Sequence, residues 1–484
     1  MFKLFRKTFF TVAALFVLIS EGVFAQTVTA KPNEFPLELA QKLNEKVAEL
    51  HKVNNLYGIS VAVRLLDESQ WLGITGVNSA APGDTLNKNL LFCFASNTKM
   101  FTAATTLLLF EEDKLSLDDS LHKWLPQFPN IDSTITVRQL LNHKSGLFDF
   151  LSNDSYWEAV NTEIEKAWEP EDVLKYIKAP LAKPGEKWNY CNTNYILLGM
   201  IIEKVTQQDL ADVFRERLFE PFGMKHTCLA TKDSLIGEMA HNWRDVDDKG
   251  HYVDLGVYNL KSLWTSSWAA GGAFSTAEDM ANWAMQLFKN KLFHIDTFKE
   301  MTTFTPITLA PYYDGYGLGV FRQTMYDVML WGHGGGTPGF NSEVIFSPEY
   351  RFSIALVMNQ DGKNPVPLIK EILKVVLDYN TTKLEKEKTE KPSKFGLYQN
   401  YPNPFNAATT IEYYLPENGN VELKIANILG EEVKTLEAGE YPAGFHKTSW
   451  DGTNNSDDSM TSGIYFCQLK TEQEVLTKRL LFLK

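Results

Sequence analysis

The sequence predicts a mixed α and β protein followed by a small all-β domain, and three observations carry this prediction. Met100–Phe110 is apolar nearly all round, as is typical of a buried helix. Residues 332–339 contain five glycines, which suits a strand edge where a ligand approaches the backbone. After residue 394, apolar and polar residues alternate in short runs separated by turn residues, which favours a β-sandwich.

The first motif, Ser96-Asn97-Thr98-Lys99, lies where the predicted buried helix begins. Residues three apart on a helix share a face, so we expect the Lys99 ammonium beside the Ser96 hydroxyl. The helix dipole favours a Ser96 alkoxide, and burial lowers a lysine pKa from its usual value of about 10.4. We interpret Ser96 as a nucleophile and Lys99 as its base, with a helix cap as the alternative for Ser96. A second Ser-x-x-Lys, at residues 120–123, lies in a charged, surface-like stretch and is interpreted as chance.

The second motif, Tyr190-Cys191-Asn192, follows a turn signal at residues 183–188. In an extended segment Tyr190 and Asn192 point the same way, while Cys191 points into the protein. A phenol with a lowered pKa relays a proton to a leaving group, and the Asn192 amide holds a substrate carbonyl. The alternative is that Tyr190 anchors a loop and Asn192 is a turn residue.

The third motif, His333-Gly334-Gly335, lies in the glycine-rich stretch. Its backbone N–H groups, together with that of Ser96, are expected to form a two-donor oxyanion hole, and we assign the second donor to Gly336. The alternative is a glycine turn between hairpin strands, with His333 as a hydrogen-bonded loop residue.

In this order the three motifs resemble the S-x-x-K, Y-x-N and K/H-x-G motifs of the class C β-lactamase, DD-peptidase and esterase superfamily. Two further stretches resemble that superfamily, residues 140–147 and 269–280, and the likeness covers roughly residues 36 to 378. The resemblance implies an antiparallel sheet flanked by helices plus a mostly helical subdomain, with the site in the cleft between them. We interpret His143, within the first of these stretches, as structural.

The resemblance also implies a serine hydrolase that forms an acyl-enzyme on Ser96 and acts as an esterase or a D-alanyl-D-alanine carboxypeptidase. Penicillin-hydrolysing members usually carry Lys-Thr-Gly, whereas this chain offers a histidine that is charged only part of the time and no hydroxyl at Gly334. A β-lactamase is therefore an alternative, as is a non-catalytic binding or scaffold protein on the same fold. The implied roles are catalysis by Ser96, Lys99 and Tyr190 and substrate binding by Asn192, His333 and Gly335.

Other function classes lack support. The chain contains no G-x-S-x-G elbow, no H-E-x-x-H and no C-x-x-C, so neither a metal site nor a cofactor is predicted. The net charge of −13 disfavours nucleic acid and anionic membrane surfaces as partners. The expected partner at the site is a small-molecule or peptide substrate.

The first 25 residues read as a signal peptide, with basic residues, a twelve-residue apolar run over 9–20 and a small-residue site ending at Ala25. No later stretch reaches eighteen apolar residues, so a transmembrane segment is not expected. The four cysteines are too few for a disulfide scaffold. Cys93 and Cys191 either form a bridge or, as we favour, remain buried free thiols.

A composition break at residues 381–394, where eight of fourteen residues are charged, separates a domain at 26–380 from one at 395–484. The break is either a helix tail or a solvated linker. Segments of the second domain, including 397–406, 425–433 and 478–484, resemble the type A sorting domain of the type IX secretion system. That resemblance implies contact with the secretion machinery and export through the periplasm to the cell surface or the medium. The alternative is an accessory carbohydrate-binding sandwich.

Overall fold

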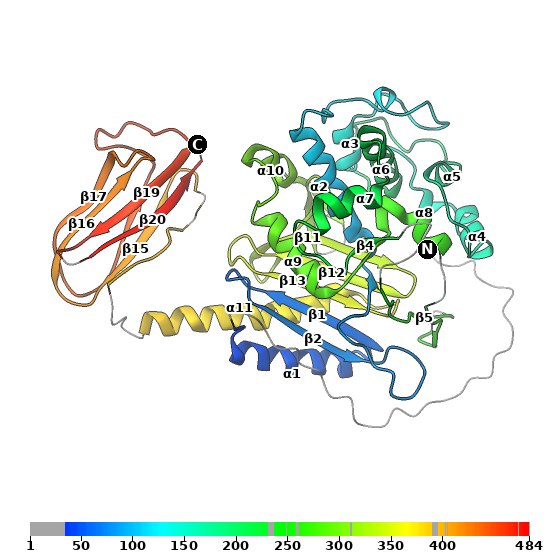
Figure 1. Cartoon of the computed structure of the whole chain (residues 1–484), viewed down its shortest axis with the longest axis horizontal. Helices are drawn as coiled ribbons and strands as arrows, with labels where there is room; N and C mark the ends of the chain where they lie inside the picture. Colours follow the sequence, from blue (N-terminus) through cyan, green and yellow to red (C-terminus); the bar gives the residue numbers. More distant parts are fainter. Residues whose placement is uncertain are drawn as a thin grey trace. The chain divides into compact units, whose positions relative to one another are not determined.

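The computed structural model describes residues 34–230, 237–247, 249–257, 261–309, 312–389, 395–401, 403, 405–472 and 474–483. The chain divides after Val376 into two compact units, each with its own hydrophobic core (Figure 1). Helix α11 (Pro365–Thr389) crosses that division, so the charged segment is a helix tail as far as Thr389. The predicted signal peptide lies outside the described residues.

The first unit is built on one antiparallel sheet with the strand order β2-β1-β13-β12-β11-β10-β9-β8. The inner strands β1 and β13 are buried along almost their whole length and are mostly apolar, because both faces of the sheet are covered. The strands are β1 (Gly58–Arg64), β2 (Gln70–Gly76), β8 (Thr305–Leu309), β9 (Tyr313–Tyr316), β10 (Phe321–Met325), β11 (Val328–Thr337), β12 (Phe340–Phe346) and β13 (Ser353–Met358).

Helices cover both faces of this sheet (Figure 1). Helix α1 (Leu37–Val53) packs on β1 and β2 through a stripe at helical spacing, formed by Leu39, Leu43, Val47 and Leu50. Helix α9 (Ala277–Phe288) packs on β1, β12 and β13, and its first turn is capped by the Thr276 side chain. The predicted antiparallel sheet flanked by helices is confirmed.

The helical region is centred on α2 (Thr98–Glu111), α6 (Asn192–Thr206) and α8 (Lys261–Gly271), which pack on one another. The sequence accounts for α2, since an almost wholly apolar helix is stable only when surrounded. The backbone of α8 is non-helical at Trp268 (φ 33°), just before two carbonyls that bond to α2. The shorter helices are α3 (Val137–Leu141), α4 (Asp154–Thr162), α5 (Pro170–Leu174), α7 (Leu210–Phe214) and α10 (Ile295–Thr302).

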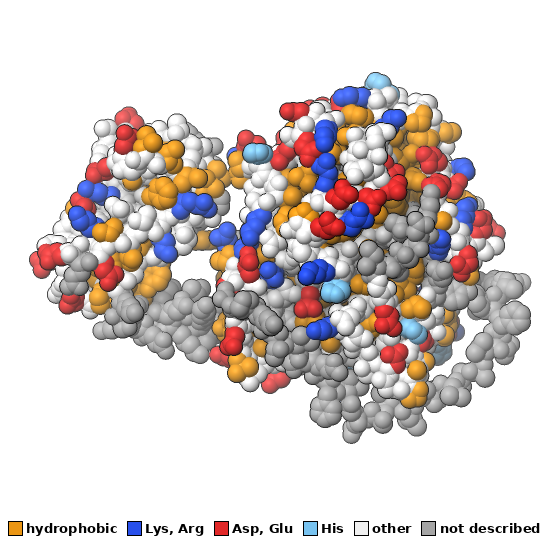
Figure 2. All heavy atoms as spheres, viewed as in Figure 1, with side chains coloured by type: hydrophobic (Ala, Val, Ile, Leu, Met, Phe, Trp, Pro, Cys, Tyr) orange, Lys and Arg blue, Asp and Glu red, His pale blue; other side chains and the backbone are white. Residues whose placement is uncertain are grey.

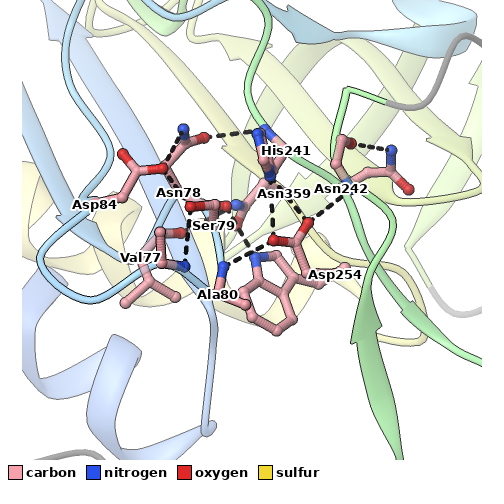
Figure 3. A network of polar contacts seen from close by, with 12 residues as sticks. Val77, Asn78, Ser79, Ala80, Asp84, His241, Asn242, Asp254 and Asn359 are labelled. Atoms are coloured by element: carbon pink, nitrogen blue, oxygen red, sulfur yellow. Dashed lines mark hydrogen bonds and ion pairs between the residues drawn. The ribbon is translucent and has the colours of Figure 1, made fainter. Parts of the chain in front are cut away.

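A polar network ties the loop after β2 to the segment that carries β5 (Trp243–Asp245) and β6 (Tyr252–Asp254) (Figure 3). The Asp254 carboxylate accepts from the Ala80 N–H at 2.7 Å and lies 3.0 Å from His241 Nδ1. The same segment passes so close to the turn after β11 that a Cβ on Gly339 would lie 2.4 Å from the Asn242 Cβ. The network therefore fixes this segment to the loop after β2, and Asn242 of the segment lies against the turn after β11.

The second unit has two antiparallel sheets, with strand orders β14-β15-β18 and β17-β16-β19-β20. Alternating residues of β15 and β16 are buried around Trp450, which is the inward-and-outward pattern that the sequence predicts. The all-β sandwich is confirmed. Its strands are β14 (Gly396–Leu397), β15 (Thr409–Leu415), β16 (Gly419–Ala426), β17 (Glu432–Tyr441), β18 (Gly444–Trp450), β19 (Gly463–Lys470) and β20 (Val475–Phe482).

Three further features of the structure bear on expectations from the composition: the surface charges, the membrane-spanning potential of the helices and the state of the cysteines. On the face shown in Figure 2, acidic and basic side chains are interspersed. None of the helices in the described part of the chain combines the length and the apolar character needed to cross a membrane. All four cysteines are buried free thiols, so the favoured interpretation of Cys93 and Cys191 is confirmed.

Candidate active site

Ser96 and Lys99 lie together at the start of α2. Ser96 belongs to a 3-10 turn, η1 (Ala95–Asn97), that leads directly into this helix. The preceding residue, Ala95, has a left-handed φ of 47°, a strained conformation that recurs at functional sites. Lys99 Nζ lies 3.1 Å from Ser96 Oγ, so the structure places the two groups as helix spacing predicts.

Burial gives Lys99 the properties of a base. Its side chain is 0% exposed, and burial lowers the pKa of Lys99 to about 7, against a smaller opposing effect of the Asp149 charge. Nζ also lies 2.7 Å from the Asn192 Oδ1 atom and 2.7 Å from the Ala270 carbonyl oxygen. In the neutral amine, two N–H bonds satisfy these acceptors, and the lone pair is then free to accept the Ser96 proton.

Tyr190 contacts the same pair of residues. Its hydroxyl is hydrogen-bonded to Ser96, and Lys99 Nζ lies 4.9 Å from the centre of its ring. The expected lowering of the Tyr190 pKa is wrong. Burial raises the pKa well above its ordinary value and outweighs the hydrogen bond to Ser96, so Tyr190 is a neutral phenol.

His143 holds the Tyr190 segment in place. Its carbonyl accepts from the Asn189 N–H at 2.9 Å, and its Nδ1 accepts from the Cys191 N–H at 3.2 Å. The His143 ring lies 4.4 Å from the Tyr190 ring, between centroids. These contacts support the structural role that the sequence predicts for this buried histidine.

Asn192 begins α6 and is not part of an extended segment, in contrast to the expectation from sequence. Its Nδ2 donates to Asp149 Oδ2 at 2.9 Å, so its Oδ1 faces Lys99. Asp149 is a residue that the sequence reasoning missed. The only signal was its place two residues after the stretch at 140–147, and no spacing rule connects it to a partner 43 residues away.

The glycines allow β11 to lie against the Ser96 turn. Strand β10 pairs with β11 only as far as Gly332, so residues 333–337 have β12 as their one partner strand within the described chain. A Cβ on Gly335 would lie 2.1 Å from the Phe94 carbonyl oxygen, which only glycine avoids. The exposed Gly336 follows on the same strand edge. The assignment of the oxyanion hole to the N–H groups of Ser96 and Gly336 stays a prediction.

His333 is buried and electrically neutral. Its side chain is 1% exposed, and burial, assisted by the nearby Lys99, lowers the pKa of His333 to about 3. Because Nδ1 lies 2.6 Å from the Gly334 carbonyl oxygen, we assign the proton to Nδ1 and leave Nε2 to accept from the Tyr316 hydroxyl at 3.4 Å. The expectation of a partly charged histidine is therefore wrong, and both ring nitrogens are occupied within the protein.

A side chain at position 334 would meet a cluster formed by the buried Glu343 and by Tyr313. A Cβ at this position would lie 2.5 Å from Glu343 Oε2 and 2.6 Å from the Tyr313 hydroxyl. Glu343 is buried, accepts from Tyr313 at 2.8 Å and from Gln323 at 2.9 Å, and burial raises its pKa to about 7. The sequence reasoning missed this cluster, and a larger residue at 334 would have to displace the Glu343 and Tyr313 side-chain ends.

A metal ion would need a cluster of side chains that could bind it. Within the residues that the structure describes, no group of three or more His, Cys, Asp or Glu side chains is arranged to hold an ion.

The fold and the cluster of Ser96, Lys99 and Tyr190 define a serine hydrolase. The chain belongs to the Beta-lactamase family, whose model matches residues 43–376. A second family model, the FlgD Ig-like domain, matches residues 405–474.

Relatives agree with this assignment. The chain is 28% identical to penicillin-binding protein 4* of Bacillus subtilis over 369 residues, which cover 72% of this chain and 79% of that protein. It is 27% identical to protein flp of Staphylococcus aureus over 294 residues, which cover 57% of this chain and 54% of that protein.

Solved structures share the fold. A D-stereospecific amidohydrolase from Streptomyces sp. matches with a TM-score of 0.59 and 27% identity, over 69% of this chain and 96% of that one. D-amino acid amidase from Ochrobactrum anthropi SV3 matches with a TM-score of 0.63 and 24% identity, over 71% of this chain and 99% of that one.

Proposed function

We propose that the first unit hydrolyses ester or amide bonds through an acyl-enzyme on Ser96, as an esterase or a D-peptide hydrolase. The observation that carries this proposal is the buried Lys99, whose amine has a pKa of about 7 and lies 3.1 Å from the Ser96 hydroxyl. A base with a pKa near the working pH is suited to remove a proton during attack.

The reaction follows from the positions of three side chains. Lys99 removes the Ser96 proton as Oγ forms a bond to the substrate carbonyl carbon, and the carbonyl oxygen accepts from the N–H groups of Ser96 and Gly336. The Tyr190 phenol then gives its proton to the leaving alcohol or amine and receives one from Lys99. The bond to the leaving group breaks. Water attacks the acyl-enzyme with the same groups acting in reverse, and Ser96 regains its proton.

The environment of His333 supports a ranking of substrate classes by the expected rate of hydrolysis. A lysine at this position offers a permanent cation to a substrate carboxylate, but this chain has a neutral, buried histidine followed by a glycine. β-Lactams, whose carboxylate needs such a partner, therefore come last. Esters and amides come first, in line with the D-stereospecific amidohydrolase and the penicillin-binding protein among the relatives.

A substrate panel tests this order. We expect kcat/KM for p-nitrophenyl acetate to exceed that for nitrocefin by about tenfold or more, because the ester has no carboxylate and one lost charged contact costs about 1.5–3 kcal/mol. A D-alanyl-D-alanine peptide, whose carboxylate lacks the same partner, is the third substrate of the panel. The same peptide with an amidated C-terminus is the matched substrate, and we expect it to be hydrolysed at least as well. Nitrocefin as the best substrate would contradict our interpretation of His333.

A non-catalytic scaffold on this fold remains the rival proposal. Its expected signature is the loss of Ser96, Lys99 or Tyr190, and all three are retained. Absence of turnover across the panel, together with no labelling by a fluorophosphonate probe, would favour the scaffold.

We also propose that the second unit, from about residue 395, directs export of the enzyme through the periplasm to the cell surface or the medium by the type IX secretion system. The proposal rests on the sequence resemblance, and it fits a sandwich with its own core.

A chain that ends at Ser393 should keep kcat/KM within about twofold, since domains with separate cores fold independently. In its host, fractionation should find this chain trapped in the periplasm. Surface delivery of the truncated chain, or a purified chain without activity, would contradict the assignment.

A further inference from the structure

The contacts of Asp149 connect the Lys99 site to a neighbouring 3-10 turn. Asp149 precedes a 3-10 turn, η3 (Phe150–Ser152), and caps it by accepting from the Leu151 N–H at 3.3 Å. The same oxygen accepts from the Asn192 backbone N–H at 3.3 Å, and the other oxygen accepts from Asn192 Nδ2 at 2.9 Å. One carboxylate therefore joins this turn to the first residue of α6.

We propose that Asp149 is a positioning residue, which sets the orientation of the Asn192 side-chain amide and through it the direction of the Lys99 lone pair. This inference rests on the proposed function. A carboxylate only accepts hydrogen bonds, so it requires the NH₂ group of Asn192 on its own side. The carbonyl oxygen of that amide must then face Lys99, as observed at 2.7 Å.

The opposite orientation of the amide disables the base. In the observed one, Lys99 gives one N–H to Asn192 and one to the Ala270 carbonyl at 2.7 Å, which leaves its lone pair for Ser96 at 3.1 Å. With the amide turned over, its NH₂ group faces Lys99 and competes with the Ser96 hydroxyl for the lone pair. Lys99 also loses one of its two acceptors. A correctly oriented amide is thus needed for proton transfer.

The Asp149→Asn variant tests the orientation of the Asn192 amide separately from the capping of the turn η3. The new amide oxygen can keep the two backbone N–H groups of Leu151 and Asn192, and this leaves its NH₂ group facing the Asn192 NH₂ group. Two donors cannot share a hydrogen bond, so the Asn192 amide turns over. We expect kcat to fall about 100-fold with KM changed less than about threefold, since a misdirected base costs orders of magnitude in rate. Asp132→Asn, the same change in an exposed turn that bonds to Thr134, is the matched control and should keep wild-type kcat.

The pH profile gives a readout that a purely structural role would not move. The Asp149 charge raises the Lys99 pKa, so its removal should shift the acid limb of kcat/KM to lower pH. Asp149→Glu, which restores the carboxylate, should regain about tenfold of the lost kcat with the acid limb near its wild-type position. An acid limb that stays in place in Asp149→Asn would count against the proposal.

A double-mutant cycle tests whether Asp149 acts through Asn192. In an Asn192→Ala background, Asp149→Asn should lower kcat by less than about threefold, because there is no amide left to orient. If the losses in kcat from Asp149→Asn and Asn192→Ala multiply in the double variant, the proposal is overturned. If Asp149→Asn does not fold, Asp149→Ser replaces it, since serine can still cap the turn but is too short to reach the Asn192 side chain. If the Asp149 variants keep wild-type kcat while Ser96→Ala is inactive, only this inference is overturned. If Ser96→Ala is active, the proposed function is overturned.

Discussion

Ser96→Ala is expected to lower kcat/KM for p-nitrophenyl acetate by about 10⁴-fold or more, because alanine has no oxygen with which to form an acyl-enzyme. The variant should fold as the wild type does, since Ser96 is only partly buried. Labelling by a fluorophosphonate probe should disappear with the activity. Equal labelling of the wild type and the variant would remove Ser96 as the nucleophile.

Ser120→Ala is the matched control because it alters the second Ser-x-x-Lys of the chain. The Ser120 hydroxyl lies 2.9 Å from His122 Nδ1 on an exposed segment, and Lys123 pairs with Asp119 at 2.8 Å. This lysine is exposed and paired with a carboxylate, so it lacks the burial that makes Lys99 a base. We expect turnover and labelling to stay at wild-type levels. That outcome would show that burial of the lysine, and not the motif alone, makes the neighbouring serine reactive.

Local patterns predicted the parts of the site that depend on local geometry. The contact between Ser96 and Lys99 follows from helix spacing, and the buried α2 follows from an unbroken apolar run. The alternation in β15 and β16 likewise predicted the sandwich of the second unit. In each case the residues that decide the structure lie within a few positions of one another.

Features that depend on distant neighbours could not be predicted in this way. The raised Tyr190 pKa and the neutral His333 both come from burial among aromatic rings supplied by other strands and helices. The close approach of Gly334 to the Glu343 carboxyl group depends on the adjacent strand. Asp149 reaches Asn192 only because the chain folds back on itself. Desolvation and cross-strand contacts depend on the whole fold, and a single sequence does not display them.

Lys99→Met should produce the second largest loss, about 10³-fold or more in kcat/KM, because methionine fills a similar volume but cannot accept a proton. In the wild type, kcat/KM should rise with pH through about 7, as Lys99 loses its proton. The remaining activity of the variant should lack this acid limb. Retention of both the limb and the rate in Lys99→Met would assign the base to another residue.

The same substitution has an effect on stability whose sign follows from the pKa of Lys99. The folded-state pKa of about 7 lies below the unfolded value of about 10.4, so between these values the unfolded chain binds more protons. This burial therefore destabilises the fold below pH 7, and the wild-type free energy of unfolding should gain up to about 1.4 kcal/mol per pH unit above it. Lys99→Met should lack that gain, although it leaves the Asn192 and Ala270 oxygens without their donor. Urea unfolding of both proteins at pH 7 and pH 9 measures the difference, and parallel pH dependence in the two would show that Lys99 keeps its charge in the folded state.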